Sequence, residues 1–206
     1  MSTDYIPMSN RSQTTCRILE ATIASLVTNG FAKTSIGTLA TDLDVSKGVV
    51  HYHFPSKEML LQETIAYIYE TAFAEVRPGI DATADDWGKL EQFIRASVAF
   101  HRDRSGYVLA LREILMNFRP IQHRSYAAKR LEQEFAEVSE LLVAGQKHGN
   151  FRSFDPELMA LTIRQALGGT TAKIGVEGYD FAHHTDELVA LFYHGIVRQP
   201  LQNGQE

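Results

Sequence analysis

The sequence contains a single cysteine, Cys16, and this scarcity narrows where the protein works. One thiol cannot form an intrachain disulfide, which fits a reducing compartment. No apolar run approaches the roughly 18 residues that a membrane-spanning helix needs. The first 15 residues lack the cationic start and the apolar stretch of a secretory signal. We therefore expect a cytoplasmic protein without a membrane partner.

The motifs of common enzyme classes are also missing. The sequence has no Ser or Cys nucleophile motif, no glycine-rich phosphate loop and no spaced set of Cys and His ligands. His51 and His53 do not suit a metal pair, because residues two apart on a helix point about 200° away from each other. We expect no catalysis, no metal and no cofactor.

Charge is distributed unevenly along the chain. The 206 residues carry a net charge of −5, of which residues 1–57 contribute +1 and the remaining residues −6. An acidic protein is not suited to indiscriminate binding of nucleic acid. A weakly basic N-terminal part on an acidic remainder nevertheless indicates that this part meets a polyanion.

Apolar residues recur at helical spacing throughout, and no alternation of apolar and polar residues suggests a strand. We predict an all-α fold. Ser35, Ser46 and Ser56 stand where helix caps are expected, and Pro78 with Gly79 is expected to stop the fourth helix. The predicted helices cover residues 12–29, 36–43, 46–53 and 56–77, and then about 85–103, 105–118, 123–148, 156–177 and 185–197.

The stretch VSKGVVHYHFPSKEML, residues 45–60, crowds basic, aromatic and glycine residues together. Its short predicted helix follows another short helix and a longer first one, which is the order of a helix-turn-helix unit. In such a unit the second short helix lies in the major groove of DNA. Pro55 ends this helix because it disfavours helical geometry at Phe54. The stretch therefore predicts recognition of DNA.

The residues of this predicted recognition helix suit a duplex. Gly48 lets the backbone approach, Lys47 can donate to a guanine edge or a phosphate, and Val49 offers methyl groups to a thymine. Further donors that can reach phosphate groups are His51, Tyr52, His53 and Lys57. Two alternatives stay open, since Tyr52 could pack in the core and Lys57 could be an ordinary solvated lysine.

The stretch TSIGTLATDLDVSKGVVHYHFPSKEMLL, residues 34–61, resembles the signature of the TetR family of transcription regulators, and RILEATIASLVTNGFAKTS resembles that family's first helix. The resemblance covers about residues 12–65. It implies a homodimer with a DNA-binding domain in residues 1–57 and a helical domain in residues 58–206 that dimerises and binds an effector. Most such proteins are repressors that the effector releases from a double-stranded DNA operator.

Carried over position by position, the resemblance assigns the recognition helix to residues 46–53. It assigns contacts with the DNA backbone to Thr34, Ser35 and Lys57. The full set of expected DNA contacts is Thr34, Ser35, Ser46, Lys47, Gly48, Val49, His51, Tyr52, His53 and Lys57. The sequence departs from the family pattern at Asp44, which replaces the usual turn glycine, and at His51, where tyrosine is usual. Gly37 inside the second helix costs about 1 kcal/mol relative to alanine.

The remainder of the chain carries no motif that names a ligand. Small residues at 168–172 and apolar residues on the last two helices suggest dimerisation, with an ordinary intramolecular core as the alternative. The apolar residues of this expected interface are Leu161, Leu167, Ile174, Leu188, Leu191, Phe192 and Ile196. Candidates for an effector pocket are Phe93, Phe100, His101, Tyr107, Leu111, Arg112 and Met116. The competing function is a helical protein-interaction adaptor that does not bind DNA.

Overall fold

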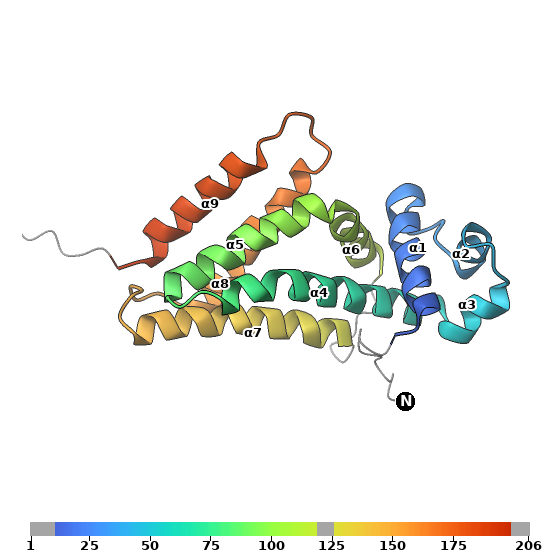
Figure 1. Cartoon of the computed structure of the whole chain (residues 1–206), viewed down its shortest axis with the longest axis horizontal. Helices are drawn as coiled ribbons and strands as arrows, with labels where there is room; N and C mark the ends of the chain where they lie inside the picture. Colours follow the sequence, from blue (N-terminus) through green and yellow to red (C-terminus); the bar gives the residue numbers. More distant parts are fainter. Residues whose placement is uncertain (1–10, 119–125, 199–206) are drawn as a thin grey trace, which may run out of the picture. The chain divides into compact units, whose positions relative to one another are not determined.

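The structure, a computed structural model, describes residues 11–118 and 126–198, except for the side chains of residues 126–134. The prediction of an all-α fold is confirmed, and the only β pairing within the described residues is an isolated bridge between Phe151 and Val197. The helices are α1 Gln13–Asn29, α2 Ile36–Asp42, α3 Lys47–His53, α4 Lys57–Asp81, α5 Asp86–Asp103, α6 Ser105–Asn117, α7 Tyr126–Lys147, α8 Pro156–Gly169, the 3-10 helix η2 Thr170–Lys173, and α9 Phe181–Ile196 (Figure 1).

The helices form two compact units. The first contains α1, α2, α3, α4 up to Phe73, and α6, whereas the second contains α4 from Ala74, α5, α7 from Gln133, α8, η2 and α9. The predicted division after residue 57 separates the chain by role rather than by packing, and it stays a prediction.

The first unit is built around α1, against which both α2 and α6 pack (Figure 1). Ser12 caps the start of α1 by accepting a hydrogen bond from the Thr15 amide, and Gly30 ends it with a φ of 77°. Fully buried aliphatic side chains from α1, α2, α3, α4 and α6 meet in one core. Its largest members include Ile18, Leu19, Leu39, Leu60, Leu61, Ile65 and Ile114.

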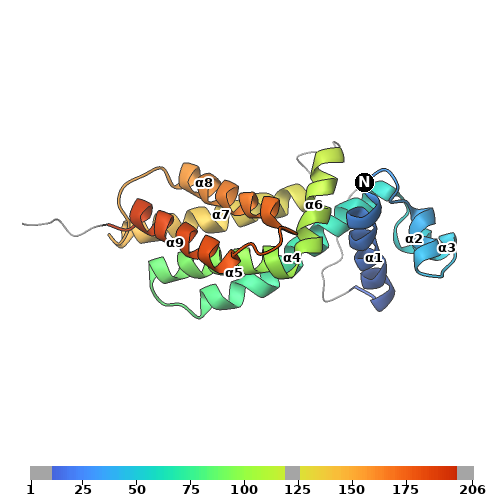
Figure 2. The same ribbon diagram turned by 90° about the horizontal axis from the view of Figure 1, so that it is seen from above.

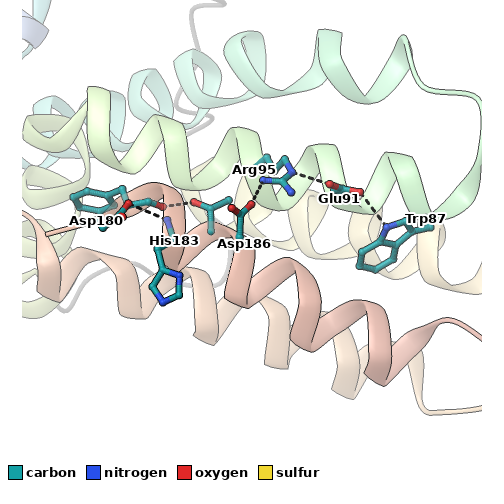
Figure 3. A network of polar contacts seen from close by, with 8 residues as sticks. Trp87, Glu91, Arg95, Asp180, His183 and Asp186 are labelled. Carbon is teal, nitrogen blue, oxygen red and sulfur yellow. Dashed lines mark hydrogen bonds and ion pairs between the residues drawn. The ribbon is translucent and has the colours of Figure 1, made fainter.

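The second unit pairs α5 with α9 and packs α8 against α5 (Figure 2). Figure 3 shows polar side chains that run from α5 to α9. Glu91 accepts hydrogen bonds from Trp87 Nε1 at 3.1 Å and from Arg95 Nε at 2.7 Å. Arg95 also donates to Asp186 on α9 at 2.8 Å. Because these groups are partly exposed, they orient α9 beside α5 more than they stabilise the unit.

Three predicted helix ends were wrong. Helix α4 does not stop at Pro78 but continues to Asp81. Proline lacks the N–H that would bond to the fourth residue before it, yet its carbonyl still accepts, and the Ala82 amide donates to Pro78 O at 3.1 Å. Pro78 therefore lies within the last turn instead of ending the helix.

The helix expected over residues 156–177 is shorter, because α8 ends at Gly169 and is followed by η2. The hydroxyls of Thr170 and Thr171 donate to the carbonyls of Leu167 and Gly168 at 2.7 and 2.8 Å. Such side-chain bonds, next to two glycines, compete with continuation of the helix. Helix α9 begins earlier than predicted, since Asp180 accepts from the His183 amide at 2.9 Å and caps it. Residues 123–125 of the predicted seventh helix lie outside the described residues.

Candidate nucleic-acid interface

The turn between α2 and α3 keeps its geometry without the usual glycine. Asp44 has a φ of 53°, and it is the one non-glycine residue with a positive φ in the part of the chain that the structure describes. Aspartate enters this left-handed region at lower cost than most residues. The Val45 amide then donates to Ala40 O at 2.9 Å, which ties the start of α3 to α2. The departure at Asp44 therefore preserves the turn.

Helix α3 is held from one side only. Ser46 caps it by accepting from the Val49 amide at 3.3 Å, as predicted. Val50 and Phe54 are buried in the core of the first unit. Phe54 has extended backbone geometry before Pro55 and ends the helix there. The opposite face is exposed at Lys47, Gly48, Val49, His51 and Tyr52.

Tyr52 lies on this exposed face with 84% of its surface accessible. The alternative in which it packs in the core is therefore wrong. A tyrosine offers an aromatic ring and a hydroxyl donor at once. Together with the ammonium group of Lys47 and the imidazole of His51, it gives α3 several donors and no carboxylate of its own. Such a surface suits the acceptor-rich backbone of a nucleic acid.

Gly37 has a structural explanation in the position of Lys47. A Cβ atom at Gly37 would lie 3.1 Å from Cε and 3.4 Å from Nζ of Lys47. The absence of a side chain on α2 therefore leaves room for the stem of Lys47. This space accounts for a residue that otherwise weakens a helix.

Thr34 and Ser35, which were predicted to contact the DNA backbone, differ in how far they are buried. Thr34 is only 1% exposed, and its hydroxyl donates to Gly30 O at 3.0 Å and lies 3.1 Å from the Ser25 hydroxyl. This burial argues against a phosphate contact by the Thr34 side chain. Ser35 is half-buried and caps α2 by accepting from the Thr38 amide at 3.1 Å. Its role on DNA stays a prediction.

Lys57 is engaged inside the first unit. Its ammonium group donates to Phe31 O at 2.7 Å and lies 4.3 Å from the centre of the Phe31 ring. Burial lowers the pKa of Lys57 below its usual value. Lys57 is therefore not an ordinary solvated lysine. Two further N–H hydrogens remain on the ammonium group, so a phosphate contact stays a prediction.

His53 also has an internal partner, which the sequence did not reveal. Its Nδ1 lies 3.1 Å from the hydroxyl of Thr15 at the start of α1. Its ring meets the edge of Tyr52 with a centroid separation of 5.3 Å. His53 is half-buried, in contrast to the exposed His51. The two histidines of the motif therefore occupy different environments.

The seven predicted pocket residues divide between the two units. Phe93 and Phe100 are buried in the second unit, where His101 Nδ1 lies 2.6 Å from the Thr170 hydroxyl and burial lowers the pKa of His101. In the first unit, Leu111 packs on the core and Met116 is 75% exposed. The remaining two, also in the first unit, are Tyr107 and Arg112.

Tyr107 takes part in a cluster that sequence analysis missed. Its hydroxyl and that of Tyr67 both donate to Oε1 of Glu20. The carboxylate on α1 thereby links α4 and α6, and no periodicity in the sequence signals such a long-range pairing. Arg112 is exposed. The prediction that Tyr107, Arg112 and Met116 line a pocket gains no support from these positions.

Some of the expected dimerisation residues are buried within the chain, and others are exposed. Leu167, Phe192 and Ile196 are buried in the core of the second unit, which corrects their assignment to an interface. Leu161 and Leu191 are exposed, and so is Leu158, which the sequence analysis did not select. The sequence spacing could not distinguish the two faces, because both carry apolar residues.

No described helix is sufficiently long and apolar to traverse a bilayer. Within the same residues there is also no group of three or more His, Cys, Asp or Glu side chains suited to a metal ion.

Comparison with known proteins identifies the N-terminal region. The family described as "Bacterial regulatory proteins, tetR family" matches residues 18–64. The HTH-type transcriptional repressor KstR2 of Mycobacterium tuberculosis is 24% identical over 148 residues, which cover 71% of this chain and 74% of that protein. Its solved structure, described as a ketosteroid transcriptional regulator, has a TM-score of 0.74 at 21% identity and spans 92% of this chain and 97% of that chain.

Two further solved structures share the fold. AibR in complex with isovaleryl coenzyme A and operator DNA has a TM-score of 0.76 at 16% identity, covering 87% of this chain and 97% of that chain. A regulator from Saccharomonospora viridis in complex with choline has a TM-score of 0.78 at 22% identity, covering 92% and 100%. Through the helix-turn-helix of α2 and α3 and the match over residues 18–64, the chain carries the DNA-binding domain of the tetR family of bacterial regulatory proteins and is a DNA-binding transcriptional regulator.

Proposed function

We propose that the protein represses transcription as a homodimer that binds a near-palindromic operator, with α3 of each copy in the major groove. The observation that carries the proposal is the one-sided packing of α3. Val50 and Phe54 anchor the helix in the core while Lys47, His51 and Tyr52 stand on its exposed face. We infer that Lys47, Gly48 and Val49 approach base edges and that His51, Tyr52 and His53 contact phosphates.

Dimerisation is proposed through α8 and α9. Leu158 and Leu191 are 62% and 63% exposed, and Leu161 on α8 is exposed as well. Several large aliphatic side chains exposed on two helices of one unit suit burial by a second copy. A two-fold dimer would present two recognition helices and so match an operator with two related half-sites.

Release by a small molecule is proposed for the helices of the C-terminal part. AibR and the regulator from Saccharomonospora viridis are described with isovaleryl coenzyme A and with choline, respectively. These two compounds differ in size and charge, so we propose an effector without assigning its chemical class. The effector must bind more tightly to a conformation with low affinity for DNA, since only differential affinity shifts an equilibrium.

The test is selection of bound sequences from random double-stranded DNA, followed by titration of the selected site at several salt concentrations. We expect one near-palindromic sequence, and binding that weakens steeply as salt rises because phosphate contacts release counterions. Tyr52→Ala should weaken binding, whereas Val27→Ala, at an exposed position on α1, should not. Failure to select any sequence would favour the protein-interaction adaptor instead.

A further inference from the structure

We propose that Thr15 is a positioning residue for the DNA contact of His53. In this arrangement the Thr15 hydroxyl donates to Nδ1 of His53, so that Nε2 carries the ring hydrogen and donates to a phosphate oxygen. The inference rests on the proposed contact between His53 and DNA. It adds residues of α1, outside the helix-turn-helix, to the determinants of binding.

The geometry is a chain of three polar groups between α1 and α3. Thr15 is buried in the first turn of α1, and its hydroxyl lies 3.1 Å from His53 Nδ1 and 2.8 Å from the Ser12 hydroxyl. Ser12 Oγ accepts the Thr15 amide hydrogen at 3.1 Å. The Ser12 hydroxyl hydrogen therefore remains available to the Thr15 oxygen.

When the imidazole of His53 is neutral, it carries one ring hydrogen, and two arrangements of the hydrogen bonds are possible. In the first, Ser12 donates to Thr15 and Thr15 donates to Nδ1, which leaves the single hydrogen of the neutral ring on Nε2. In the second, Nδ1–H donates to Thr15, and Nε2 becomes an acceptor that repels a phosphate oxygen. Binding of DNA through Nε2 therefore selects the first arrangement, which both hydroxyls are placed to support.

The same chain of contacts extends from His53 to the exposed Tyr52 on α3. The rings of His53 and Tyr52 meet edge to face, with an interplanar angle of 86°. An imidazole fixed by Thr15 thereby limits the positions that Tyr52 can take. The cap of α1 thus orients two of the side chains proposed to contact DNA.

A double-mutant cycle on the full-length protein with the selected operator tests this inference. The variants are Thr15→Val, which keeps the shape of the side chain, His53→Ala, and both together. Thr14→Val is the matched control in the same turn, and Thr15→Ser should restore binding because it restores the hydroxyl. Thermal unfolding of every variant measures any loss of folding separately.

We expect Thr15→Val to weaken binding roughly two- to tenfold in the wild-type background, the range for loss of one hydrogen bond. It should have little effect on binding in the His53→Ala background. Equal losses in both backgrounds, or no loss in either, would overturn the role of Thr15 while leaving the His53 contact intact. If His53→Ala itself binds like the wild type, the proposed contact fails, and with it this inference.

Discussion

The ammonium group of Lys57 donates to the carbonyl oxygen of Phe31 at 2.7 Å and lies over the ring of the same residue. One side chain at the start of α4 thus holds the segment that connects α1 to α2. Lys57, which the sequence analysis assigned to DNA, therefore has a role in folding. This role can be measured in the absence of DNA.

Lys57→Ala should lower the free energy of unfolding by about 1–3 kcal/mol, because it removes a charged hydrogen bond and a cation–π contact. Urea unfolding without DNA measures this loss. Lys33→Ala, at an exposed lysine of the same connection, serves as the control. An unchanged midpoint for Lys57→Ala would show that the contacts with Phe31 do not stabilise the first unit.

The hydroxyls of Tyr67 and Tyr107 predict an alkaline loss of stability. Burial, followed by the hydrogen bond to the Glu20 carboxylate, raises the pKa of Tyr67 to about 12 and also raises the pKa of Tyr107. Because the folded-state pKa values exceed the unfolded value near 10, this stabilisation is complete below about pH 10 and is lost as the pH rises further.

Urea unfolding between about pH 8 and 12 measures the effect. Tyr107→Phe should make the decline above pH 10 shallower, whereas Tyr52→Phe, at the exposed tyrosine of α3, should leave it unchanged. A Tyr107→Phe curve parallel to that of the wild type would contradict the expected linkage.

The environment of Asp86 predicts a loss of stability at acid pH. Burial acts to raise the pKa of Asp86, but hydrogen bonds from Asn150 and His148 outweigh it and lower the pKa below its usual value. A lowered carboxyl pKa gives stability that is present above about pH 4 and is lost as the pH falls through the folded-state value. Asp86→Asn should flatten this acid limb, measured by circular dichroism, and Glu140→Gln on α7 should not. A steep acid limb in Asp86→Asn would argue against the role of this cluster.

Gly145 on α7 predicts a substitution that the second unit cannot accommodate. A Cβ at this position would lie 2.2 Å from Cδ2 of Phe151, whose ring is buried. Gly145→Ala should cost about 1–3 kcal/mol by overpacking. Gly195→Ala, where nothing lies within 4 Å of the added atom, should instead stabilise α9 by up to about 1 kcal/mol. Two variants with the same midpoint in urea would refute this reading of the packing.

Leu191 tests the proposed dimer. Leu191→Asp combined with Leu158→Asp should convert the dimer into a monomer, because two charges would then have to be buried. Analytical ultracentrifugation reads the outcome directly. Leu115→Asp, at an exposed leucine of α6, is the control. A double variant that still sediments as a dimer would place the interface elsewhere.

Local signals in the sequence predicted much of the helix-turn-helix. Ser35 and Ser46 cap helices as expected, and Asp44 adopts the left-handed conformation that its position in the turn implied. Such features depend on a few neighbouring residues, so their residue types are informative. The predicted end of the fourth helix at Pro78 was wrong, because the effect of a proline depends on its position within a helix.

Long-range partners were beyond the reach of the same reasoning. The hydrogen bonds between Thr15 and His53 and between Glu20 and Tyr107 join residues that are 38 and 87 positions apart. Periodicity indicates which face of a helix is apolar, but it does not indicate which polar group on another helix will face it. The predicted pocket stays a prediction for a related reason, since aromatic spacing alone does not separate a cavity from a core.

The composition of the core of the first unit determines which fragments of the protein can fold on their own. Its core requires Leu60, Leu61 and Ile65 of α4 and Ile114 of α6 in addition to the residues of α1, α2 and α3. A fragment that ends at residue 57 would lose these buried side chains and expose their partners to water, with the larger part of its stability gone. The DNA-reading helices therefore cannot be excised or transplanted as a contiguous cassette. A working chimera would have to carry α6 and the first part of α4 along with them.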